Sequence, residues 1–405
     1  MKVLGIMSGT SLDGIDLALL EVGNPSPPQS SPDPRLLQPP TWELSAFRTK
    51  PYSPDRRTRI QETMASGASR DLALLHTSLG EWFAEATLEF LSEIGVPSDS
   101  IAALGSHGQT VWHEPPRTGA RGSSFQLGCP ATLAERTGID VVSDFRSRDL
   151  AAGGHGAPLV PWADRVFFSS PEGPRAIQNL GGMANVTWLP RAGDATPILA
   201  FDTGPGVALL DTAAGLATDG RKRFDEDGEL SAKGQVHEGV VQRVLAHPFF
   251  RQAPPRSTGR ELFGTSMAND LMAEVARDLG SELVPGRPSQ GWPDVLATLT
   301  ALTARSIGDA YRRWVIPRGV DEVFLMGGGS RNPALFRAIE EELSPIPLRF
   351  GEALGMDPDA REAAAFALLA WAHVTGVPAN VPEATGSQGL RVLGSWTPGR
   401  RGAGP

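Results

Sequence analysis

The sequence predicts an α/β protein built from two related lobes. Short apolar segments alternate with polar, glycine-rich turns and with amphipathic helical segments, which favours strands whose ends carry ligand-binding loops. This pattern starts twice, once near residue 1 and again near residue 175. The length of 405 residues fits two to three units at roughly 150 residues per domain. We therefore expect two α/β lobes with a cleft between them.

The elements of the first lobe follow from local patterns. Two apolar segments that flank a turn of Gly, Ser, Thr and Asp indicate a β-hairpin, and a run with seven prolines indicates an exposed, inserted loop. Apolar residues at three- and four-residue spacing predict an amphipathic helix. The expected elements are, in order, a hairpin of 3–7 and 15–22, a loop at 24–40, a helix from Leu72 to Gly95, and short buried strands at 101–104 and 140–143.

The second lobe repeats the alternation of strand and glycine-rich turn. We expect strands at 175–178, 198–201 and 322–326, each followed by such a turn, and a helix over roughly 294–314. The expected organisation is a first lobe at 1–140, a second lobe at 141–397 with a late helix near 358–375 packing back on the first, and a disordered tail at 398–405.

Composition excludes several classes of protein. The balance of 37 basic against 46 acidic residues, with no basic run, argues against a sequence-independent nucleic-acid binder. The single cysteine, Cys129, excludes an intramolecular disulfide and a thiolate metal cluster. No P-loop motif and no Gly-x-Ser-x-Gly motif is present. The longest apolar run, 363–374, is shorter than the ~20 residues that span a bilayer, so we expect a soluble, cytoplasmic protein.

Three glycine-rich turns at predicted strand ends indicate a nucleotide site. The turn from Ser8 to Asp13 presents backbone N–H and hydroxyl groups that suit phosphate oxygens, although an ordinary polar hairpin is the alternative. Asp202 precedes two glycines and could hold Mg²⁺, or it could belong to a simple strand-exit turn. The third turn, Gly327 to Gly329, permits close approach of a flat ring or a phosphate.

Two further strand-exit segments are candidates for catalysis and sugar binding. Asp144 follows a predicted strand beside Arg146 and a flexible glycine loop, which suits a general base, with a surface Asp–Arg pair as the alternative. The polar segment 105–110 could donate hydrogen bonds to sugar hydroxyls or to an amide. A lone histidine such as His107 is more often structural than a metal ligand.

Taken together, the motifs resemble the signature of the anhydro-N-acetylmuramic acid kinases, and the resemblance runs nearly from end to end. The matching segments are 5–16, 105–110, 143–146, 178–185, 201–206, 327–332 and 379–386. The resemblance implies the actin/hexokinase/Hsp70 fold, with two ribonuclease H-like lobes, ATP and Mg²⁺ in the cleft, and domain closure. It also implies an ATP-dependent kinase of murein recycling that opens the 1,6-anhydro bridge of 1,6-anhydro-N-acetylmuramic acid and phosphorylates O6.

By motif position, the resemblance implies roles for individual residues. Asp144 would be the base that activates water. Arg146 would either bind the lactyl carboxylate or orient Asp144. The implied ATP-binding residues are Gly9, Thr10, Ser11, Leu12, Asp13, Gly14, Ile15, Asp16, Gly204, Gly206, Gly327, Gly328 and Gly329; the implied sugar-binding residues are Ser106, His107, Gln109, Arg146 and Glu362; and the implied metal ligand is Asp202, with Asp13 second.

The sequence departs from the pattern of the family at three places. His155 stands where the family usually has glutamine, the loop at 24–40 looks like an insertion, and Ser8 stands where the superfamily often has aspartate. The expected partners are ATP and the anhydro sugar, and a homodimer is compatible with the sequence. Two other functions stay open: a kinase for another amino sugar on the same fold, or a nucleotide-switched binding protein.

Overall fold

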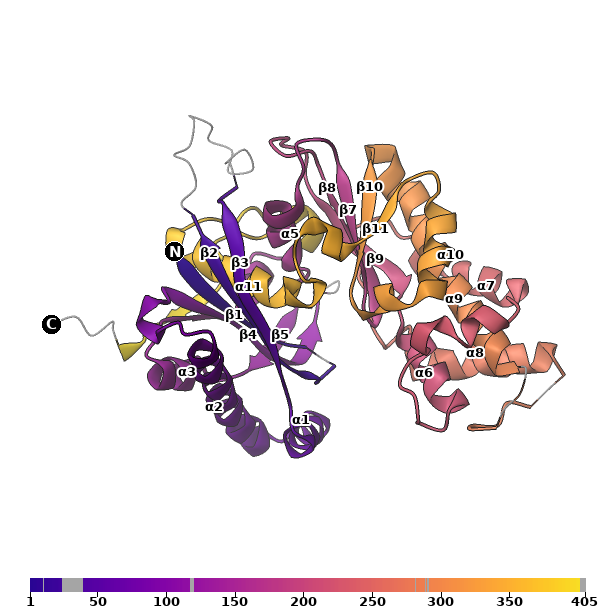
Figure 1. Ribbon diagram of the computed structural model, residues 1–405, viewed down its shortest axis with the longest axis horizontal. Helices are drawn as coiled ribbons and strands as arrows, with labels where there is room; N and C mark the ends of the chain where they lie inside the picture. The colour runs from indigo at the N-terminus through magenta and orange to yellow at the C-terminus, as the bar shows by residue number, and fades with distance from the viewer. Residues whose placement is uncertain are drawn as a thin grey trace. The chain divides into compact units, whose positions relative to one another are not determined.

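The computed structural model describes residues 1–9, 11–23, 39–116, 120–280, 282–287, 289 and 291–400. The chain forms two compact units (Figure 1). The first unit comprises Met1–Phe167, Gly193–Ala195 and Asp359–Pro405, and the second comprises Phe168–Ala192 and Thr196–Pro358.

The sheet of the first unit is mixed. Its first three strands form an antiparallel meander, and two later strands add in parallel beside the first strand. The strand order is β12-β6-β4-β1-β2-β3, with β5 antiparallel to β4 and β12 antiparallel to β6. The strands are β1 (Lys2–Ser8), β2 (Gly14–Val22), β3 (Trp42–Pro51), β4 (Ala103–Glu114), β5 (Ser123–Leu127), β6 (Val141–Ser143) and β12 (Ser395–Thr397).

One core of the first unit lies between its sheet and α2. The apolar side chains that recur at helical spacing in α2, among them Leu75, Leu79 and Phe83, are buried with residues of β1, β2 and β4, so the predicted helix is confirmed. The helix ends just before Gly95, which adopts a left-handed φ of 67°. The helices of this unit are α1 (Pro54–Ser66), α2 (Ser69–Glu93), α3 (Pro130–Thr137), α4 (Ser147–Ala151), α5 (Val160–Phe168), α11 (Arg361–Thr375) and α12 (Pro382–Thr385).

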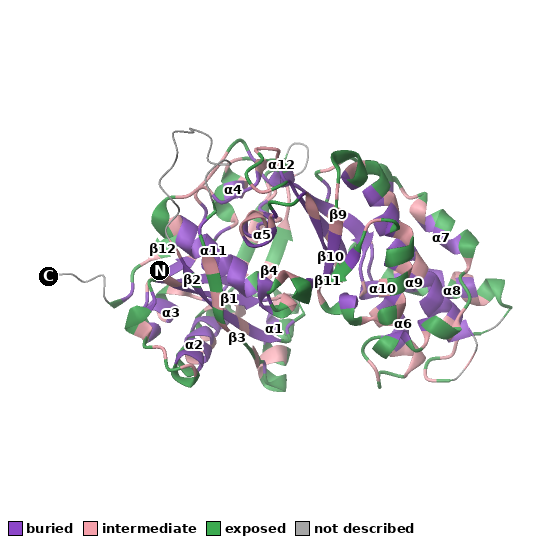
Figure 2. Ribbon diagram, turned by 45° about the horizontal axis from the view of Figure 1, so that its top comes forward, coloured by how far each residue is buried: buried purple, intermediate pink, exposed green. Residues whose placement is uncertain are grey.

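Helix α11 packs on β1, β2 and β4 at very short range. A Cβ atom at Gly5 would lie 1.8 Å from the Ala363 carbonyl oxygen, and one at Gly105 would lie 2.0 Å from that of Phe366. Two glycines in neighbouring strands therefore let the backbone of α11 approach the sheet. Figure 2 shows α11 as an almost continuously buried helix, which explains the alanine-rich apolar run in this part of the sequence.

The sheet of the second unit repeats the plan of the first. Three strands again form an antiparallel meander, and two later strands again add in parallel beside the first of them, in the order β11-β10-β7-β8-β9. The strands are β7 (Arg175–Leu180), β8 (Met183–Leu189), β9 (Leu199–Pro205), β10 (Glu322–Met326) and β11 (Leu348–Phe350). The prediction of two related α/β lobes is therefore confirmed.

Helix α9 is the central helix of the second unit. It is buried along most of its length, with one core cluster against the sheet and another against α6, α7 and α8. The helices of this unit are α6 (Ala208–Ala217), α7 (Glu238–Leu245), α8 (Thr265–Asp278), α9 (Gly291–Ala310) and α10 (Pro333–Leu343). Short 3₁₀ turns occur in both units at 98–100, 226–228, 231–233, 248–251, 316–318, 328–331, 351–354 and 358–360, and a π turn follows α9 at 311–315.

The boundaries between the two compact units differ from the boundary expected at 140/141. Strand β6 pairs with β4 by backbone hydrogen bonds, so residues 141–167, including Asp144, belong to the first unit. The chain from Asp359 onward also belongs to the first unit, because α11 packs on its sheet. Strand pairing between distant segments decides this division, and local sequence patterns do not contain it.

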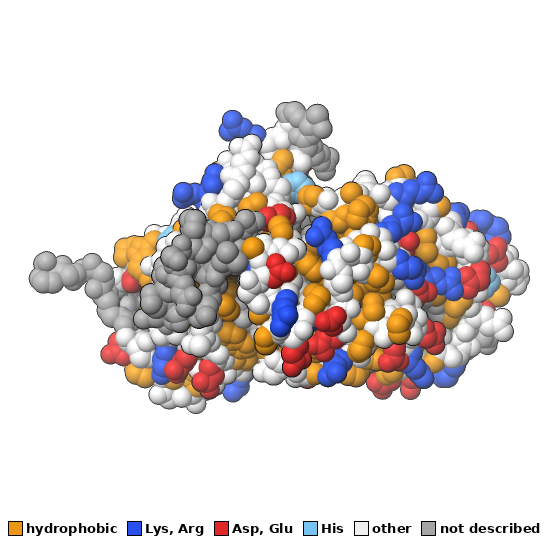
Figure 3. All heavy atoms as spheres, turned by 90° about the horizontal axis from the view of Figure 1, so that it is seen from above, with side chains coloured by type: hydrophobic (Ala, Val, Ile, Leu, Met, Phe, Trp, Pro, Cys, Tyr) orange, Lys and Arg blue, Asp and Glu red, His pale blue; other side chains and the backbone are white. Residues whose placement is uncertain are grey.

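Some expectations fall at the limits of the described residues. Most of the loop expected at 24–40 lies outside them, as do 401–405 of the expected tail. Within that tail, the Gly399 N–H donates to Asp140 Oδ1 at 2.6 Å, and Arg400 pairs with Glu135, so these residues are held on the first unit. Among the described residues, no helix is long and apolar enough to cross a membrane. On the face seen in Figure 3, Lys and Arg side chains are interspersed with Asp and Glu side chains.

Candidate functional site

Three parallel strand ends bring the predicted residues of the first unit to one edge of its sheet. Ser8 ends β1 and lies beside Gln109 of β4, and Asp144 follows β6 directly. Because β1, β4 and β6 run parallel, their carboxyl ends meet at the same edge. Glu362, in the first turn of α11, acts electrostatically on residues of this edge, namely Asp16 and Arg146.

Buried side chains hold the turn between β1 and β2. Ser8 Oγ donates to Gln109 Oε1 at 2.6 Å and accepts from the Tyr52 hydroxyl at 2.9 Å. Gln109 Nε2 donates to the Gly9 carbonyl oxygen at 3.3 Å. Gln109 is fully buried, so it anchors the turn and is not free to reach a sugar. The hydroxyl of Ser8, where aspartate was noted as usual in the superfamily, is fully used in this network.

The predicted ATP-binding residues of this turn differ in whether their side chains are accessible to a nucleotide. Thr10 lies outside the described residues. Leu12 and Ile15 belong to the core, and Gly14 is also buried, so only their backbone could contact a nucleotide. Ser11 and Asp13 are exposed at the surface of the turn. The turn is closed by a hydrogen bond from Leu12 N–H to the Gly9 carbonyl oxygen at 3.2 Å.

Asp16 is the carboxyl group of this region whose acidity changes most. It is half-buried, and Thr49 Oγ1 donates to its Oδ1 at 2.6 Å. Burial raises the pKa of Asp16 to about 6, and the negative charges of Glu362, Asp359 and Asp13 add to the effect. Among the residues that the structure describes, no three His, Cys, Asp or Glu side chains gather in a way that could hold a metal ion by themselves.

Asp144 is exposed and its backbone is strained. Its φ of 54° lies in the left-handed region, which is uncommon for a residue other than glycine and clusters at functional sites. Its Oδ1 accepts a hydrogen bond from Ser147 Oγ at 2.5 Å. Asp144 and Arg146 make no hydrogen bond or ion pair, so the simple surface pair considered from the sequence is not formed.

Arg146 instead bonds to His107 and to the glycine loop. Arg146 Nε and Nη2 donate to His107 Nε2 at 3.2 and 2.8 Å, and Nη1 donates to the Gly156 carbonyl oxygen at 2.8 Å. His107 is buried, and its Nδ1 lies 2.9 Å from the Gly108 carbonyl oxygen. Both ring nitrogens are therefore occupied inside the protein, and His107 is not free to contact a sugar. Ser106, its neighbour, is also buried, and its hydroxyl has no partner.

The glycine loop is fixed by the closing motif of the chain. Asp149 is fully buried and accepts from the Gly156 N–H at 2.9 Å, from Asn380 Nδ2 at 3.1 Å and from Thr385 Oγ1 at 2.8 Å. The His155 N–H donates to the Thr385 carbonyl oxygen at 2.7 Å. The motif at 379–386 thus has a structural role, because it sets the conformation of the loop that receives Arg146.

In the second unit, glycines gather where β7, β9 and β10 end. A Cβ at Gly206 would lie 2.0 Å from the Gly181 carbonyl oxygen, and one at Gly327 would lie 2.7 Å from Asn179 Oδ1, so both positions need glycine. Gly328 is exposed and faces open space. Helix α6 begins at Ala208, so its first turn lies in the same region, a known arrangement for binding anions, although the N–H groups of Gly206 and Ala208 already donate to the Gly182 carbonyl oxygen. Gly204 differs, because a Cβ there would meet Phe250 and Ser306 in the interior.

Asp202 lies near the end of β9 and is the most strongly perturbed of the predicted site residues in this unit. Its Oδ2 accepts from the Thr258 N–H at 2.7 Å, and Arg256 Nε donates to its carbonyl oxygen at 2.9 Å. Burial raises the pKa of Asp202 to about 7. A carboxyl group that titrates near neutral pH suits proton transfer better than an ordinary aspartate.

The segment that supports Asp202, residues 256–261, is not among the residues predicted from the sequence. Residues 256–261 read Arg-Ser-Thr-Gly-Arg-Glu, and this polar run with a glycine was the available signal. Arg256 is buried and donates to the carbonyl oxygens of Phe249, Phe250 and Gln252, which fixes the segment against β9. The Thr258 hydroxyl is buried without a partner.

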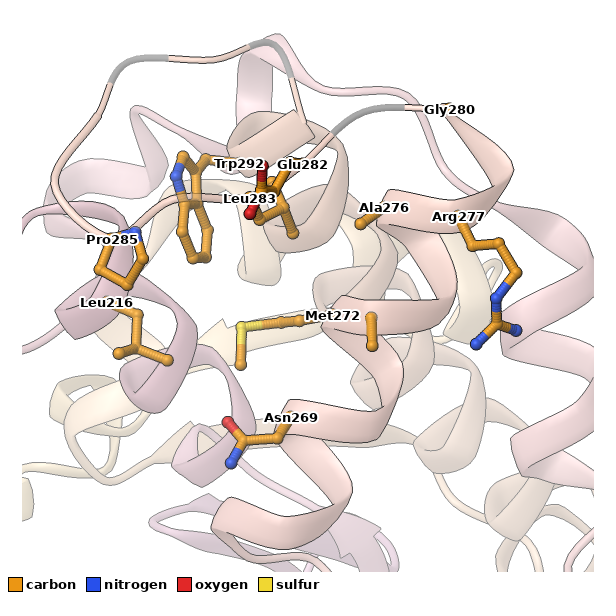
Figure 4. A pocket seen from close by; sticks show the side chains of 11 residues that line it. Leu216, Asn269, Met272, Ala276, Arg277, Gly280, Glu282, Leu283, Pro285 and Trp292 are labelled. Atoms are coloured by element: carbon orange, nitrogen blue, oxygen red, sulfur yellow. The ribbon is translucent and has the colours of Figure 1, made fainter.

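The second unit also has a hollow away from these residues (Figure 4). It has a volume of about 660 Å³ and is lined mainly by apolar side chains such as Leu216, Met272, Leu283 and Trp292. None of the residues predicted from the sequence lines it. Convergent polar groups and perturbed carboxyls, which mark reaction sites, lie elsewhere.

Comparison with known proteins confirms the resemblance drawn from the motifs. The family model described as anhydro-N-acetylmuramic acid kinase matches residues 1–399. The anhydro-N-acetylmuramic acid kinase of Gloeobacter violaceus is 41% identical over 398 residues, which is 98% of each chain. That of Caldanaerobacter subterraneus is 40% identical over 399 residues, covering 97% of this chain and 96% of the relative.

Among solved structures, the activator of the 2-hydroxyisocaproyl-CoA dehydratase from Clostridium difficile, with bound ADPNP, matches with a TM-score of 0.43 and 15% identity. The match covers 93% of this chain and 96% of that one. The family model and the two relatives span nearly the whole sequence and include every motif quoted above. The chain therefore belongs to the anhydro-N-acetylmuramic acid kinase family.

Proposed function

We propose that this chain opens the 1,6-anhydro bridge of 1,6-anhydro-N-acetylmuramic acid with water and transfers the γ-phosphoryl group of ATP to O6. The observation that carries the proposal is membership in the family over residues 1–399. In the reaction, water oxygen bonds to C1, the bond from C1 to O6 breaks, and O6 bonds to phosphorus as ADP leaves. A base takes one proton from water, and the products are N-acetylmuramic acid 6-phosphate and ADP.

We propose that ATP phosphates bind backbone N–H groups at the two glycine-rich regions. In the first unit these belong to the turn from Gly9 to Asp16, including Thr10. In the second unit they belong to Gly327–Gly329 and the first turn of α6. Gly206, whose own N–H donates to the Gly182 carbonyl oxygen at 3.0 Å, and Gly204 are packing positions that keep this turn in shape. Convergent N–H groups can bind phosphate oxygens without a lysine, so these glycine-rich regions suit the role.

We propose that Mg²⁺ binds together with the phosphates of ATP. Mg²⁺ in kinases is usually held by one or two carboxylates together with phosphate oxygens and water, so a single aspartate at each region is compatible with it. We propose Asp202 first and Asp13 second as the carboxylates. When bound, the ion would neutralise charge on the phosphates.

Two carboxyl groups are candidates for the base. Asp144 is the candidate from the motif, and its exposure and strained backbone support it. Asp202 is a second candidate, as an alternative to its role as a Mg²⁺ ligand, supported by a pKa of about 7, because a base works best when its pKa lies near the operating pH. Replacement of each by asparagine separates them: the base variant should lose roughly 10²–10⁴ in kcat while its ATP affinity persists.

For the sugar, we propose that Arg146 binds the lactyl carboxylate. The alternative, that it orients Asp144, has less support because no contact joins the two side chains. Glu362 and the unpartnered hydroxyl of Ser106 are proposed as further sugar contacts. His107 and Gln109 would not contact the sugar. His107 would hold Arg146, and Gln109 would hold the turn between β1 and β2.

Mass analysis of products from ATP and the anhydro sugar in ¹⁸O-labelled water tests the proposal. We expect a 6-phosphate with one solvent oxygen at C1. Phosphorylation without solvent oxygen would indicate a kinase for another amino sugar. ATP hydrolysis stimulated by unfolded peptide, with no sugar product, would indicate a nucleotide-switched binding protein. We further propose a cytoplasmic enzyme that forms a homodimer, which sedimentation of the purified chain would test.

A further inference from the structure

His107 bonds to Arg146 inside the protein, and both of its ring nitrogens have protein partners, so it is not free to contact a ligand itself. We propose that His107 is a positioning residue: as a neutral imidazole it accepts from two N–H groups of Arg146 and holds the guanidinium as the receptor for the substrate carboxylate. The proposal rests on the proposed function, since it concerns how this chain recognises an acidic sugar. The hydrogen bonds and ring packing of His107 and Arg146 in the first unit support it.

The hydrogen bonds fix the tautomer of His107. A guanidinium can only donate, so His107 Nε2, which lies 2.8 and 3.2 Å from two nitrogens of Arg146, must be the acceptor. The ring proton is therefore on Nδ1, where it is donated to the Gly108 carbonyl oxygen at 2.9 Å. Burial and the charge of Arg146 lower the pKa of His107 well below its usual value, which keeps the ring neutral.

Packing fixes the orientation of the ring. The imidazole lies against Phe366 of α11, with ring centroids 4.6 Å apart, and Phe366 in turn packs against Phe145 at 5.4 Å. Phe145 directly precedes Arg146 in the chain. The ring is thus packed on an aromatic pair whose second member is the chain neighbour of Arg146, and the hydrogen bonds to Nε2 join the ring to the guanidinium.

Arg146 retains donors and charge for a ligand. Its bonds to His107 and Gly156 use three of its five N–H groups, which leaves one on each terminal nitrogen unused among the described residues. A carboxylate that binds in bidentate fashion takes two. Burial lowers the pKa of Arg146 to about 10, so it stays charged at neutral pH. Glu362 acts on it only from a distance, because no carboxylate forms an ion pair with it.

A half-buried charge that pairs with no carboxylate among the described residues is costly, and a bound anion would offset the cost. The partners of Arg146 in the protein are neutral, a carbonyl and an imidazole, and a neutral partner orients the guanidinium without satisfying its charge. A carboxylate in place of His107 would neutralise the receptor. This explains why a histidine in this tautomer suits the position.

Two variants, each with an amide near the position of one ring nitrogen of His107, test the proposal. His107→Gln places an amide oxygen near the position of Nε2 and keeps an acceptor for Arg146. His107→Asn keeps a donor near the position of Nδ1 but lacks that acceptor. Because hydrogen bonds to charged groups contribute strongly, we expect His107→Asn to raise KM for the anhydro sugar about 10- to 100-fold, with KM for ATP unchanged and His107→Gln within about threefold of the native protein.

The carboxamide of the same sugar separates positioning from a folding defect. Direct binding by calorimetry should show that the native protein prefers the acid to the amide, and that His107→Asn loses this preference while its affinity for the amide is retained. Equal losses for acid and amide, or an unchanged acid affinity in His107→Asn, would overturn the proposal. If the native protein binds no anhydro sugar at all, the proposed function has failed instead, and the two failures are distinguishable.

Discussion

Asp202→Asn tests whether Asp202 acts as the base, the alternative to its role as a Mg²⁺ ligand; as the base, it would give catalysis a pH-dependent step that the variant lacks. Burial raises the pKa of Asp202 to about 7, so the deprotonated fraction rises from about one tenth at pH 6 to about nine tenths at pH 8. A base must be deprotonated to act, and kcat/KM of the native protein should therefore rise about tenfold over this range. The variant should lose roughly 10²–10⁴ in kcat and show no such rise.

The assay is ADP release at saturating ATP and low anhydro-sugar concentration, followed across pH 6 to 8. Asp144→Asn is the matched control, since it makes the same chemical change at the other candidate base. Asparagine can still accept from the Thr258 N–H through its amide oxygen, so the local structure around position 202 should persist. Thermal unfolding followed by circular dichroism checks this.

Either of two results would refute the reasoning. The native rate could change less than about twofold between pH 6 and 8, which would mean that Asp202 does not titrate there as a base. Alternatively, Asp202→Asn could keep the pH dependence while Asp144→Asn removes it, which would assign the base to Asp144.

Three further predictions concern stability and nucleotide binding. Arg361→Met leaves fully buried Asp164 without the guanidinium that now bonds it at 2.8 and 2.5 Å, so chemical denaturation should show a loss of about 3–5 kcal/mol, partly regained in the double variant with Asp164→Leu. Asp211 has a pKa raised to about 7 by burial, so the folded protein binds a proton that the unfolded chain releases above pH 4, and stability falls as pH rises from about 4 to 7. Asp211→Asn should therefore melt like the native protein at pH 4 and be more stable at pH 8 by about 2 kcal/mol; equal melting at pH 8 would contradict the burial argument. Gly206→Ala forces a Cβ against the Gly181 carbonyl oxygen and should weaken ATP binding at least tenfold by calorimetry, whereas Gly328→Ala, where space is open, should change it little.

The general plan of the fold was predictable because it is encoded in short-range patterns. The hairpin after Met7, the helix through Leu75 and Phe83, and the glycine turn at Gly327 each follow from residue types within a few positions. Repetition of the same order of elements from residue 175 predicted the second lobe. The two sheets share a meander of three antiparallel strands with two later parallel strands added on one side, which confirms that prediction.

Much of the site could not be predicted, because it depends on partners far apart in the chain. From the sequence alone, Gln109 and His107 belong to a polar loop after a predicted strand at 101–104, and both suit a sugar site. That loop prediction is wrong, because the segment continues β4 as far as Glu114. In the fold, Gln109 bonds to Ser8, 101 positions away, and His107 bonds to Arg146, 39 positions away. Each is consumed by a protein partner, which no local pattern reveals.

The sequence by itself therefore determined the class of fold, the family and the set of segments that carry the chemistry, since these depend on residue order. Only the tertiary structure decided which members of that set face a ligand and which face each other. It also decided acidity, because the raised pKa of Asp202 comes from its burial in the folded unit. Burial and pairing sum over neighbours brought together by folding, and for that reason they are properties of the folded chain and not of any motif within it.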